Sequence, residues 1–331
     1  MMREIVVNGR FLSRRITGVE RYGREILSWI GSNSRVEMTR ANGVAGHLWE
    51  QSILPAKLTS KSILWSPANS GPLLVRNQAL TIHDLSPLEH PEWFRRSFAA
   101  WYRLFLPILA KRARVVFTPS KYVRRKVVER FGIQHVIVAP NGVNPSFFHP
   151  GAQQCIDQLP ARYILFVGTL QPRKNLYALM LAWDEIKDEY ADLWLIIAGG
   201  EEFVFEKIKI TTSERVLYLG YVREDPLAGL YANAELFVLP SFEEGFGLPV
   251  LEAMASGTPV IASDGGALPE IVGDAGMVFR RSDPKNLSET IRECLDNNNL
   301  YCSLVAKGLE HIKKYSWQTS AEIIWNALND I

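Results

Sequence analysis

Two glutamates that flank a glycine-rich stretch have the type and spacing to bind a ligand. Glu244 and Glu252 enclose the sequence Gly-Phe-Gly-Leu-Pro-Val-Leu, which follows the apolar run 236–239. Gly245 and Gly247 would expose backbone N–H groups at the positive end of the helix that starts just after them. Two carboxylate acceptors and several N–H donors suit a ligand that is anionic or rich in hydroxyl groups. The alternative is that these residues only cap the helix.

Two adjacent cations occupy a comparable position earlier in the chain. Gly168 follows the apolar run 163–167, and Arg173 and Lys174 come next, at a junction between a strand and a helix. An arginine fork and a lysine point charge can together neutralise the negative charge that grows on a departing nucleotide diphosphate. The sequence has no Asp-x-Asp pair to hold a catalytic divalent ion, so the cations predict a metal-independent reaction. A solvated basic turn is the alternative.

Long apolar runs supply the strands that would position these groups. Uninterrupted apolar strands are typical of parallel sheets covered on both faces, and helical patterns lie between several of them. The pattern therefore predicts an α/β fold. The expected strands are residues 5–8, 62–65, 79–82, 115–118 and 136–139 in the first half, and 163–168, 193–198, 216–219, 236–239 and 259–262 in the second.

The length of 331 residues suits two domains rather than one hydrophobic core. A stretch rich in Pro, Gly and Gln at 145–160 interrupts the alternation of strands and helices and is the expected linker. We predict one domain at 1–150, a second at 151–314, and an amphipathic helix at 315–331 that crosses back to the first domain. Doubly wound domains bind ligands beyond the carboxyl ends of their strands, so a cleft between the two domains is the expected site.

Cysteine content and hydropathy indicate the compartment. The three cysteines, Cys155, Cys294 and Cys302, have no metal-ligand spacing, and their odd number argues against a disulfide framework. No apolar stretch has the length of a signal peptide or a membrane span. We expect a cytoplasmic protein that is soluble or peripheral at the inner face of a membrane.

The net charge of +2 hides an asymmetry between the two halves of the chain. Residues 1–150 hold 22 Lys and Arg against 9 Asp and Glu, whereas residues 151–331 hold 15 against 26. The stretch 90–130 mixes aromatic residues with Arg and Lys, as do helices that lie at an anionic membrane interface. The alternatives are a solvated basic face and a nucleic-acid surface. No nucleic-acid module accompanies the charge, so nucleic acid is not an expected partner.

These motifs, in this order, resemble the retaining GT-B glycosyltransferases of family 4. The Glu-x7-Glu motif of that family is matched by Glu244 and Glu252, and the similarity covers nearly the whole chain. The resemblance implies two Rossmann-like doubly wound domains that face each other across a cleft, with the acceptor domain first and the nucleotide-sugar domain second. The other matching positions are Gly18, His83-Asp84, Pro119-Ser120, Asn141-Gly142-Val143, Arg173-Lys174, Gly199-Gly200 and Tyr315-Ser316-Trp317.

The resemblance implies donor-binding roles for residues of the second domain. Glu244 would contact the transferred sugar, and Glu252 would accept hydrogen bonds from the ribose hydroxyls. Arg173 and Lys174 would bind the diphosphate. The remaining expected donor-binding residues are Gly168, the backbone amides of Gly245, Phe246, Gly247 and Leu248, and, around the base, Gly199-Gly200 and Tyr221-Val222.

Three residues of the first domain complete the expected site. Gly18 would let the backbone approach the diphosphate when the cleft closes. His83 follows a strand and would bond the sugar or orient the acceptor hydroxyl, although a lone histidine is more often structural. Asp84 would orient His83 or, alternatively, cap the next turn. His83, Asp84 and Glu244 are therefore the expected catalytic residues.

The family implies retention of the anomeric configuration, with the acceptor attacking on the face that the diphosphate leaves. The leaving phosphate would take the proton, and Glu244 is an alternative nucleophile for a double displacement. The segments 16–26 and 83–87 are similar to those of bacterial mannosyl- and rhamnosyltransferases that build surface polysaccharides such as O-antigen. This similarity favours transfer of mannose from GDP-mannose to a lipid-linked or oligosaccharide acceptor, with no cofactor, at an anionic membrane.

Other functions of the same architecture are alternatives. One alternative is a transferase that uses a rhamnose or glucose nucleotide as its donor. Another is a sugar-nucleotide epimerase, which needs no acceptor. The intact set of Glu244, Glu252, Arg173 and Lys174 argues against a non-catalytic nucleotide-sugar sensor. A dehydrogenase is disfavoured because the sequence lacks a Gly-x-Gly-x-x-Gly fingerprint with its acidic partner.

Overall fold

The computed structural model describes residues 4–41, 43–153, 156–202, 204–206 and 213–331. The chain forms two compact units, and each unit combines separate stretches of the sequence. The first unit comprises Met1–Pro91, Arg96–Gly142 and Ser316–Ile331, and the second comprises Glu92–Arg95 and Val143–Tyr315.

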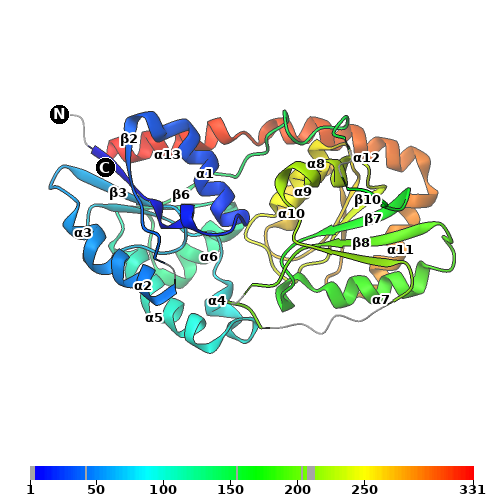
Figure 1. The fold of residues 1–331 in the computed structure, drawn as a ribbon, viewed down its shortest axis with the longest axis horizontal. Coiled ribbons are helices and arrows are strands. Elements are labelled where there is room, and N and C mark those ends of the chain that lie inside the picture. The colour runs from blue at the N-terminus through cyan, green and yellow to red at the C-terminus, as the bar shows by residue number, and fades with distance from the viewer. Residues whose placement is uncertain (1–3, 42, 154–155, 203, 207–212) are drawn as a thin grey trace. The chain divides into compact units, whose positions relative to one another are not determined.

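The first unit is built on a six-stranded parallel sheet (Figure 1). In spatial order its strands are β2 (Ser34–Glu37), β1 (Glu4–Asn8), β3 (Ser62–Ser66), β4 (Gln78–Thr81), β5 (Val115–Thr118) and β6 (Val136–Val138). The strand order reverses between β1 and β3, and ligands of open α/β sheets generally bind beside the loops that follow such strands. The helices are α1 (Gly18–Ile30), α2 (Gly43–Leu48), the π-helical turn η3 (Trp49–Ile53), α3 (Leu54–Ala56), α4 (Ser86–Glu89), α5 (Arg96–Arg112), α6 (Lys121–Phe131) and α13 (Trp317–Asp330).

The second unit also holds a six-stranded parallel sheet. In spatial order its strands are β12 (Met277–Phe279), β11 (Val260–Ser263), β10 (Leu236–Leu239), β7 (Arg162–Val167), β8 (Leu193–Ala198) and β9 (Val216–Gly220). This is the strand order of a Rossmann sheet, and it reverses between β7 and β10. The helices are α7 (Leu176–Ile186), α8 (Glu224–Ala232), α9 (Leu248–Ala255), α10 (Leu268–Val272), α11 (Pro284–Asp296) and α12 (Asn298–His311).

The strands at the centre of each sheet are the ones that their apolar runs predict. Every residue of β3, β5 and β10 is buried, as expected for strands covered on both faces. The prediction of two Rossmann-like α/β domains is therefore confirmed. The edge strands β2 and β12 were not predicted, because they are short and half exposed and have no long apolar run.

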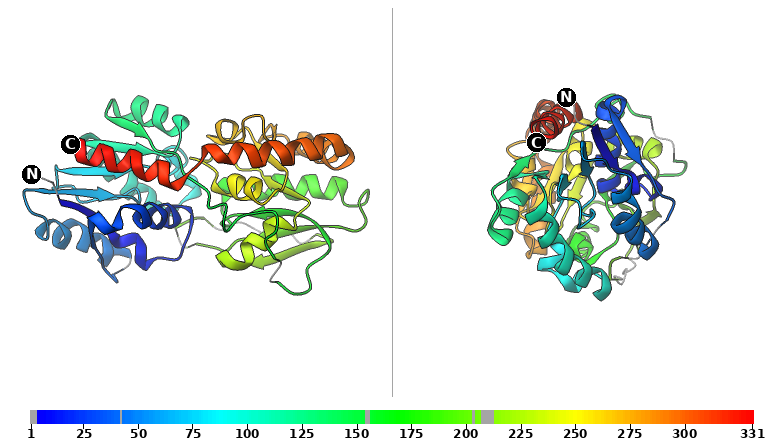
Figure 2. Two further views of the ribbon diagram at one scale, coloured as in Figure 1. Left: turned by 90° about the horizontal axis from the view of Figure 1, so that it is seen from above. Right: turned by 90° about the vertical axis from the view of Figure 1, so that its left-hand side faces the viewer.

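The C-terminal helix α13 packs on the first unit, beside α1 (Figure 2). Trp317 contacts the ring of Tyr22 with a centroid distance of 6.2 Å, and Ser320 donates a hydrogen bond to the Pro140 carbonyl. A Cβ at Gly142 would lie 2.2 Å from the Trp317 backbone nitrogen, so only glycine allows this close approach. The long stretch of the second unit starts at Val143, whereas the sequence placed the domain boundary after residue 150.

The aromatic stretch after α4 is divided between the two units. Phe94 forms an antiparallel bridge with Phe205, and the Trp93 ring stacks on Phe242 with a centroid distance of 6.3 Å; all four residues belong to the second unit. From Arg96 the chain continues as α5 of the first unit. The aromatic residues that sequence analysis grouped together therefore serve two separate cores.

No helix in the described part of the chain is long and apolar enough to cross a membrane. Among the same residues, no three or more His, Cys, Asp and Glu side chains are grouped to hold a metal ion. Cys294 is buried and Cys302 is exposed, and both are free thiols. Cys155 lies outside the described residues.

Candidate functional site

The carboxyl ends of β7 and β10 bring the expected donor-site residues together. These two strands are neighbours at the point where the strand order of the second sheet reverses. The chain after β7 carries Arg173 and Lys174 on the short 3-10 helix Pro172–Lys174, and the chain after β10 carries Glu244. Reversal points of this kind are where open α/β sheets bind their ligands.

The Glu244 carboxylate accepts hydrogen bonds from both cations. Lys174 Nζ donates to Oε1 at 2.6 Å, and Arg173 Nη1 donates to Oε2 at 2.8 Å. Ser241 Oγ donates to Oε1, also at 2.6 Å. Glu244 and Lys174 are only 5% and 7% exposed. The structure therefore assembles three of the predicted residues into one buried cluster, and it adds Ser241, which sequence analysis did not single out.

This cluster fixes the charge of Glu244. Burial by itself would raise the pKa of Glu244, but the charges of Arg173 and Lys174, with hydrogen bonds from Lys174 and Ser241, outweigh it and lower the pKa to about 2. The carboxylate is therefore ionised at neutral pH, and two cations against one carboxylate leave the cluster net positive. Such a group can hold an anion with its cations and accept hydrogen bonds from hydroxyl groups with its carboxylate.

A glycine and an asparagine shape the loops around the cluster. A Cβ at Gly266 would lie 2.3 Å from the Glu244 carbonyl oxygen, so only glycine lets the loop after β11 press against Glu244. Asn175 adopts a left-handed conformation with φ of +51°, and its Nδ2 donates to the carbonyls of Pro240 and Arg281. These bonds connect the end of the cation-bearing turn to the loops after β10 and β12.

Glu252, the second glutamate of the motif, lies in the interior on α9. Its side chain is buried, and Oε2 accepts a 2.8 Å hydrogen bond from the hydroxyl of Tyr231. Tyr231 is itself fully buried, and its ring packs edge-on against Phe148 and Phe237. Sequence analysis missed Tyr231, because its partner is 21 residues away and no spacing rule connects them.

The glycine loop between the two glutamates leads into α9. Gly247 precedes the helix with φ of +103°, and a Cβ there would lie 2.7 Å from the Leu268 side chain. Phe246 is buried with its ring edge-on to Tyr315, at a centroid distance of 5.9 Å. Its side chain, like that of Leu248, therefore serves packing. Ligand contacts through the backbone amides of 245–248 stay a prediction.

The segments expected around the nucleotide base lie side by side at the ends of β7, β8 and β9. A Cβ at Gly199 would lie 1.8 Å from the Gly168 carbonyl oxygen, so the two strand ends touch through their backbones. The Gly199 N–H donates to the Gly220 carbonyl at 2.7 Å. Tyr221 is 41% exposed, and Val222 follows it before α8. The structure thus groups Gly168, Gly199 and Val222 on one edge of the sheet.

His83 of the first unit is a buried residue with a fixed orientation. Its Nε2 is 2.7 Å from the Pro67 carbonyl oxygen, and its ring lies edge-on to Tyr22 at a centroid distance of 4.7 Å. Burial lowers its pKa, although the bond to Pro67 and the charges of Asp84 and Glu20 oppose this. His83 is therefore neutral at neutral pH. Its Nε2–H donates to Pro67, which leaves Nδ1 as a hydrogen-bond acceptor.

Asp84 and Gly18 lie near the starts of helices in the first unit. Asp84 Oδ1 accepts a 3.0 Å hydrogen bond from the Ser86 N–H, which begins α4. This is the capping alternative of the two roles considered for Asp84, and its role in orienting His83 stays a prediction. Gly18 is the first residue of α1 and is exposed.

A buried polar network beside β1 was missed by sequence analysis. The Glu50 carboxylate, which is fully buried, accepts hydrogen bonds from Asn8 Nδ2 at 2.7 Å, from Arg10 Nη1 at 3.0 Å and from Ser70 Oγ at 3.0 Å. Asn8 is the last residue of β1 and Arg10 comes two residues later, a position at the end of a strand that could have singled them out in the sequence. Glu50 lies within a helical segment and gives no such signal.

Two family models match the chain. One is described as glycosyl transferases group 1 and matches residues 161–297; the other is glycosyltransferase family 4 and matches residues 62–147. The chain is 30% identical over 261 residues to O-antigen chain mannosyltransferase B of Escherichia coli, and the alignment covers 75% of this chain and 68% of that protein. It is 26% identical over 278 residues to O-antigen chain mannosyltransferase RfbU of Salmonella typhimurium, and that alignment covers 82% of this chain and 74% of the relative.

Solved structures share the fold over nearly the whole chain. Sucrose-phosphate synthase from Thermosynechococcus elongatus matches with a TM-score of 0.77 at 18% identity, over 99% of this chain and 98% of that chain. Anabaena HepE in complex with UDP-glucose matches with a TM-score of 0.75 at 16% identity, over the full length of both chains. At these identities the likeness shows the fold alone.

Proposed function

This chain belongs to the family 4, group 1 glycosyltransferases, and from that premise we propose that it is a retaining mannosyltransferase of bacterial surface polysaccharide synthesis. The proposed donor is GDP-mannose. Two relatives, 30% and 26% identical, are named O-antigen chain mannosyltransferases, which supports both the sugar and the process. The structural observation that carries the proposal is the buried cluster of Arg173, Lys174 and Glu244 at the strand-order reversal of the second unit.

The cluster supports binding of a nucleotide diphosphate sugar. Arg173 and Lys174 supply a fork and a point charge for the diphosphate, and they neutralise the charge that grows on it as the sugar leaves. Glu244 then accepts hydrogen bonds from hydroxyls of the transferred sugar. Glu252, oriented by Tyr231, accepts bonds from the ribose hydroxyls.

In the proposed reaction the transferred sugar retains its anomeric configuration, and neither a metal nor another cofactor takes part. The acceptor oxygen bonds to the anomeric carbon on the face from which the diphosphate departs, and the departing phosphate oxygen takes the acceptor proton. A double displacement through Glu244 is disfavoured, because both of its carboxylate oxygens already accept hydrogen bonds, from two cations and Ser241. His83 Nδ1 accepts a bond from a hydroxyl and so helps to orient it.

The proposed acceptor is a lipid-linked or oligosaccharide glycan at the cytoplasmic face of the inner membrane. The basic first half of the chain, with 22 Lys and Arg against 9 Asp and Glu, supports peripheral contact with anionic lipid. On α5, Leu104 and Ile108 are 61% and 41% exposed, and Arg103 and Lys111 are exposed beside them. Apolar and basic side chains together on one helix are what an interfacial helix needs.

A donor panel tests the proposal. The protein is mixed with GDP-mannose, UDP-glucose or dTDP-rhamnose and with a set of lipid-linked and free oligosaccharide acceptors, and the products are followed by mass spectrometry. We expect transfer from GDP-mannose, with α-configured product by NMR. Lys174→Met should lower donor affinity by about 10- to 100-fold, because a charge-assisted hydrogen bond contributes about 1.5–3 kcal/mol.

The outcomes separate the alternatives. Transfer from another nucleotide sugar alone would replace the donor and keep the reaction class. Interconversion of sugar nucleotides without transfer to any acceptor would indicate an epimerase. Transfer with inverted configuration would refute the retaining mechanism.

A further inference from the structure

The segment Glu92–Arg95 belongs to the second unit, although the sequence on both sides of it belongs to the first. The chain therefore passes into the second unit after Pro91 and returns to the first at Arg96. We call residues 92–95 the strap. The proposed function gives the strap no role, yet its contacts lie on two loops of the proposed donor site.

The backbone of the strap pairs with the connection between β8 and β9. Two backbone hydrogen bonds, each 3.0 Å long, join it to the segment 204–206. Phe94 lies opposite Phe205 in this antiparallel bridge, between the two bonds. Side chains come closest at such a position, and the two rings are 5.2 Å apart. Phe94 is only 5% exposed, so both backbone and side chain hold the strap on this connection.

The neighbouring residue of the strap packs on the loop after β10. Successive side chains of an extended segment point to opposite faces, so Trp93 and Phe94 can contact different loops. The Trp93 ring lies on the Phe242 ring at a centroid distance of 6.3 Å and an interplanar angle of 19°, which is an offset stack. Two adjacent residues of the strap therefore contact two different loops of the second unit.

Phe242 is bonded to the cation-bearing turn, so its position affects the charged cluster. Its N–H donates to the Arg173 carbonyl at 2.8 Å, and Arg173 Nη1 donates to the carbonyl of the next residue, Glu243, at 2.9 Å. The same Nη1 donates to Glu244 Oε2 at 2.8 Å. A shift of the backbone at Phe242 would therefore move Arg173 relative to the Glu244 carboxylate.

The connection between β8 and β9 carries the other end of the proposed donor site. It begins with Gly199 and Gly200, where the nucleotide base is expected, and it includes Phe205. The transferred sugar is expected at Glu244, two residues after Phe242. The strap is thus attached to the loop at each end of the site, and the separation of these loops depends on it.

We propose that the strap positions the donor site by holding the loops after β8 and β10 at the separation that a nucleotide diphosphate sugar requires. Trp93 is its positioning residue for the Glu244 loop and acts through Phe242. The identity of the ligand rests on the proposed function, whereas the fixing of the two loops does not depend on any ligand. Part of donor recognition then comes from the sequence of the first half of the chain.

Hydrogen exchange on the ligand-free, full-length protein tests the fixing of the loops. We expect the amides of 241–245 to exchange several-fold faster in Trp93→Ala than in the wild type, while those of β7 and β10 stay protected. Trp93→Phe keeps an aromatic stack and should restore slow exchange. Phe242→Leu removes the stack from the other side and decides the matter if Trp93→Ala does not fold. Exchange at 241–245 as slow as in the wild type would overturn the proposal.

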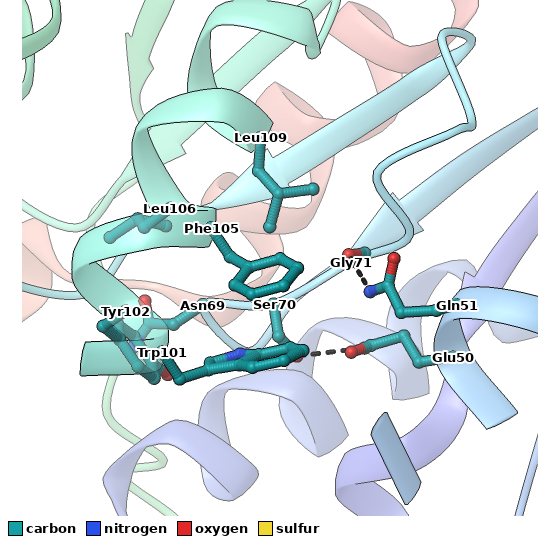
Figure 3. A pocket seen from close by; sticks show the side chains of 10 residues that line it. All are labelled: Glu50, Gln51, Asn69, Ser70, Gly71, Trp101, Tyr102, Phe105, Leu106 and Leu109. Atoms are coloured by element: carbon teal, nitrogen blue, oxygen red, sulfur yellow. Dashed lines mark hydrogen bonds between the residues drawn. The ribbon is translucent and has the colours of Figure 1, made fainter. Parts of the chain in front are cut away.

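Trp101→Ala is the matched control. Trp101 lies on α5, shortly after the strap, and its ring stacks on Phe105 in the first unit at a centroid distance of 3.6 Å (Figure 3). This variant also removes a tryptophan from an aromatic stack, but it should leave exchange at 241–245 unchanged. Equally fast exchange at 241–245 in Trp93→Ala and Trp101→Ala would show general loosening and overturn the proposal.

Calorimetry with GDP and UDP tests the effect on the donor site. The Kd of the nucleotide that binds the wild type should rise about 3- to 10-fold in Trp93→Ala, which is the range that one aromatic pair contributes, and should recover in Trp93→Phe. Unchanged affinity in Trp93→Ala would overturn the role in donor recognition. If the wild type binds neither nucleotide, the proposed function is refuted, and hydrogen exchange alone decides whether the strap fixes the loops.

Discussion

Glu244 carries its negative charge inside the second unit, and that charge links stability to pH. The pKa of Glu244 in the folded protein is about 2, below its ordinary value of 4.5, so the unfolded state binds a proton more readily. The stabilisation is complete above about pH 4.5 and is lost as the pH falls toward 2. Its size is at most about 3.5 kcal/mol, since the two pKa values differ by about 2.5 and one pKa unit corresponds to about 1.4 kcal/mol.

We therefore expect the free energy of unfolding of the wild type to fall between pH 4.5 and 2 more steeply than that of Glu244→Gln. Urea titrations at a series of pH values measure both. Glu244→Gln should also be less stable at neutral pH, because it leaves two buried cations without their carboxylate. Equal slopes in the two proteins would mean that Glu244 is not held ionised by its partners.

Tyr231 is expected to act as a positioning residue for Glu252. Tyr231→Phe removes only the hydroxyl that donates to Glu252 at 2.8 Å, and a single hydrogen bond contributes about 1 kcal/mol net. The KM for the donor should rise about 3- to 10-fold with little change in kcat, since the ribose lies away from the reacting bond. The 2′- and 3′-deoxyribose donors should be less affected than the full donor.

Tyr163→Phe is the matched control for this experiment. Tyr163 is also buried, and its hydroxyl donates at 2.9 Å to the Leu230 carbonyl, next to Tyr231 in the chain. Its loss should lower thermal stability without a change in donor KM. If both variants raise the donor KM equally, the effect of Tyr231 is only structural.

At the scale of elements, the contact between the ends of β7 and β8 depends on a glycine. Gly199→Ala would place a Cβ 1.8 Å from the Gly168 carbonyl oxygen, and backbone cannot yield as a flexible side chain does. We expect a lower melting temperature and weaker binding of GDP, measured by thermal shift and calorimetry. Gly31→Ala is the control: its Cβ would meet nothing closer than 3.7 Å, and it should be nearly neutral. A stable Gly199→Ala that binds GDP normally would contradict the expectation.

Whether a contact could be predicted from the sequence depends on the elements that carry its residues. The meeting of Arg173, Lys174 and Glu244 could be predicted, because all three follow strands and parallel strands end on one edge of a sheet. Hydrogen-bond partners that lie in the middle of helices could not be predicted in this way. Tyr231 on α8 and Glu50 on η3 are placed by tertiary packing, and no local pattern distinguishes them from other helical residues. His83 followed its strand as expected, but its bond to Pro67 depends on a loop conformation that the sequence does not specify.

At the scale of the whole molecule, the first unit includes the end of the chain. Trp317, Ile324 and Leu328 of α13 are 5%, 0% and 0% exposed. Deletion of residues 316–331 should cost more than about 5 kcal/mol, because full burial of each large apolar side chain contributes about 1.5–3 kcal/mol. That is comparable with the whole stability of a typical domain, so the first unit should unfold.

Hydrogen exchange read by mass spectrometry checks this expectation unit by unit. Amides of β1, β3 and β4 should lose protection in the truncated protein, whereas those of β7, β8 and β10 should keep it. Gly142→Ala, which crowds the Trp317 backbone, should have a smaller effect in the same direction. Protection lost equally in both sheets would show that the two units unfold as one.

The charge asymmetry of the chain makes a prediction about membranes. The first 150 residues carry 13 more basic than acidic residues, whereas the rest carries 11 more acidic than basic residues. The protein should therefore sediment with phosphatidylglycerol vesicles and not with phosphatidylcholine vesicles. Binding should weaken as salt rises above about 0.1 M, where the screening length is about 10 Å.

The double substitution Leu104→Ser and Ile108→Ser should weaken vesicle binding further, because it removes the apolar part of the α5 surface. Leu181→Ser, which alters an exposed leucine of α7 in the acidic half, should not. Salt-insensitive binding would point to apolar insertion alone, and no binding to either vesicle would leave the excess of basic residues as a solvated face.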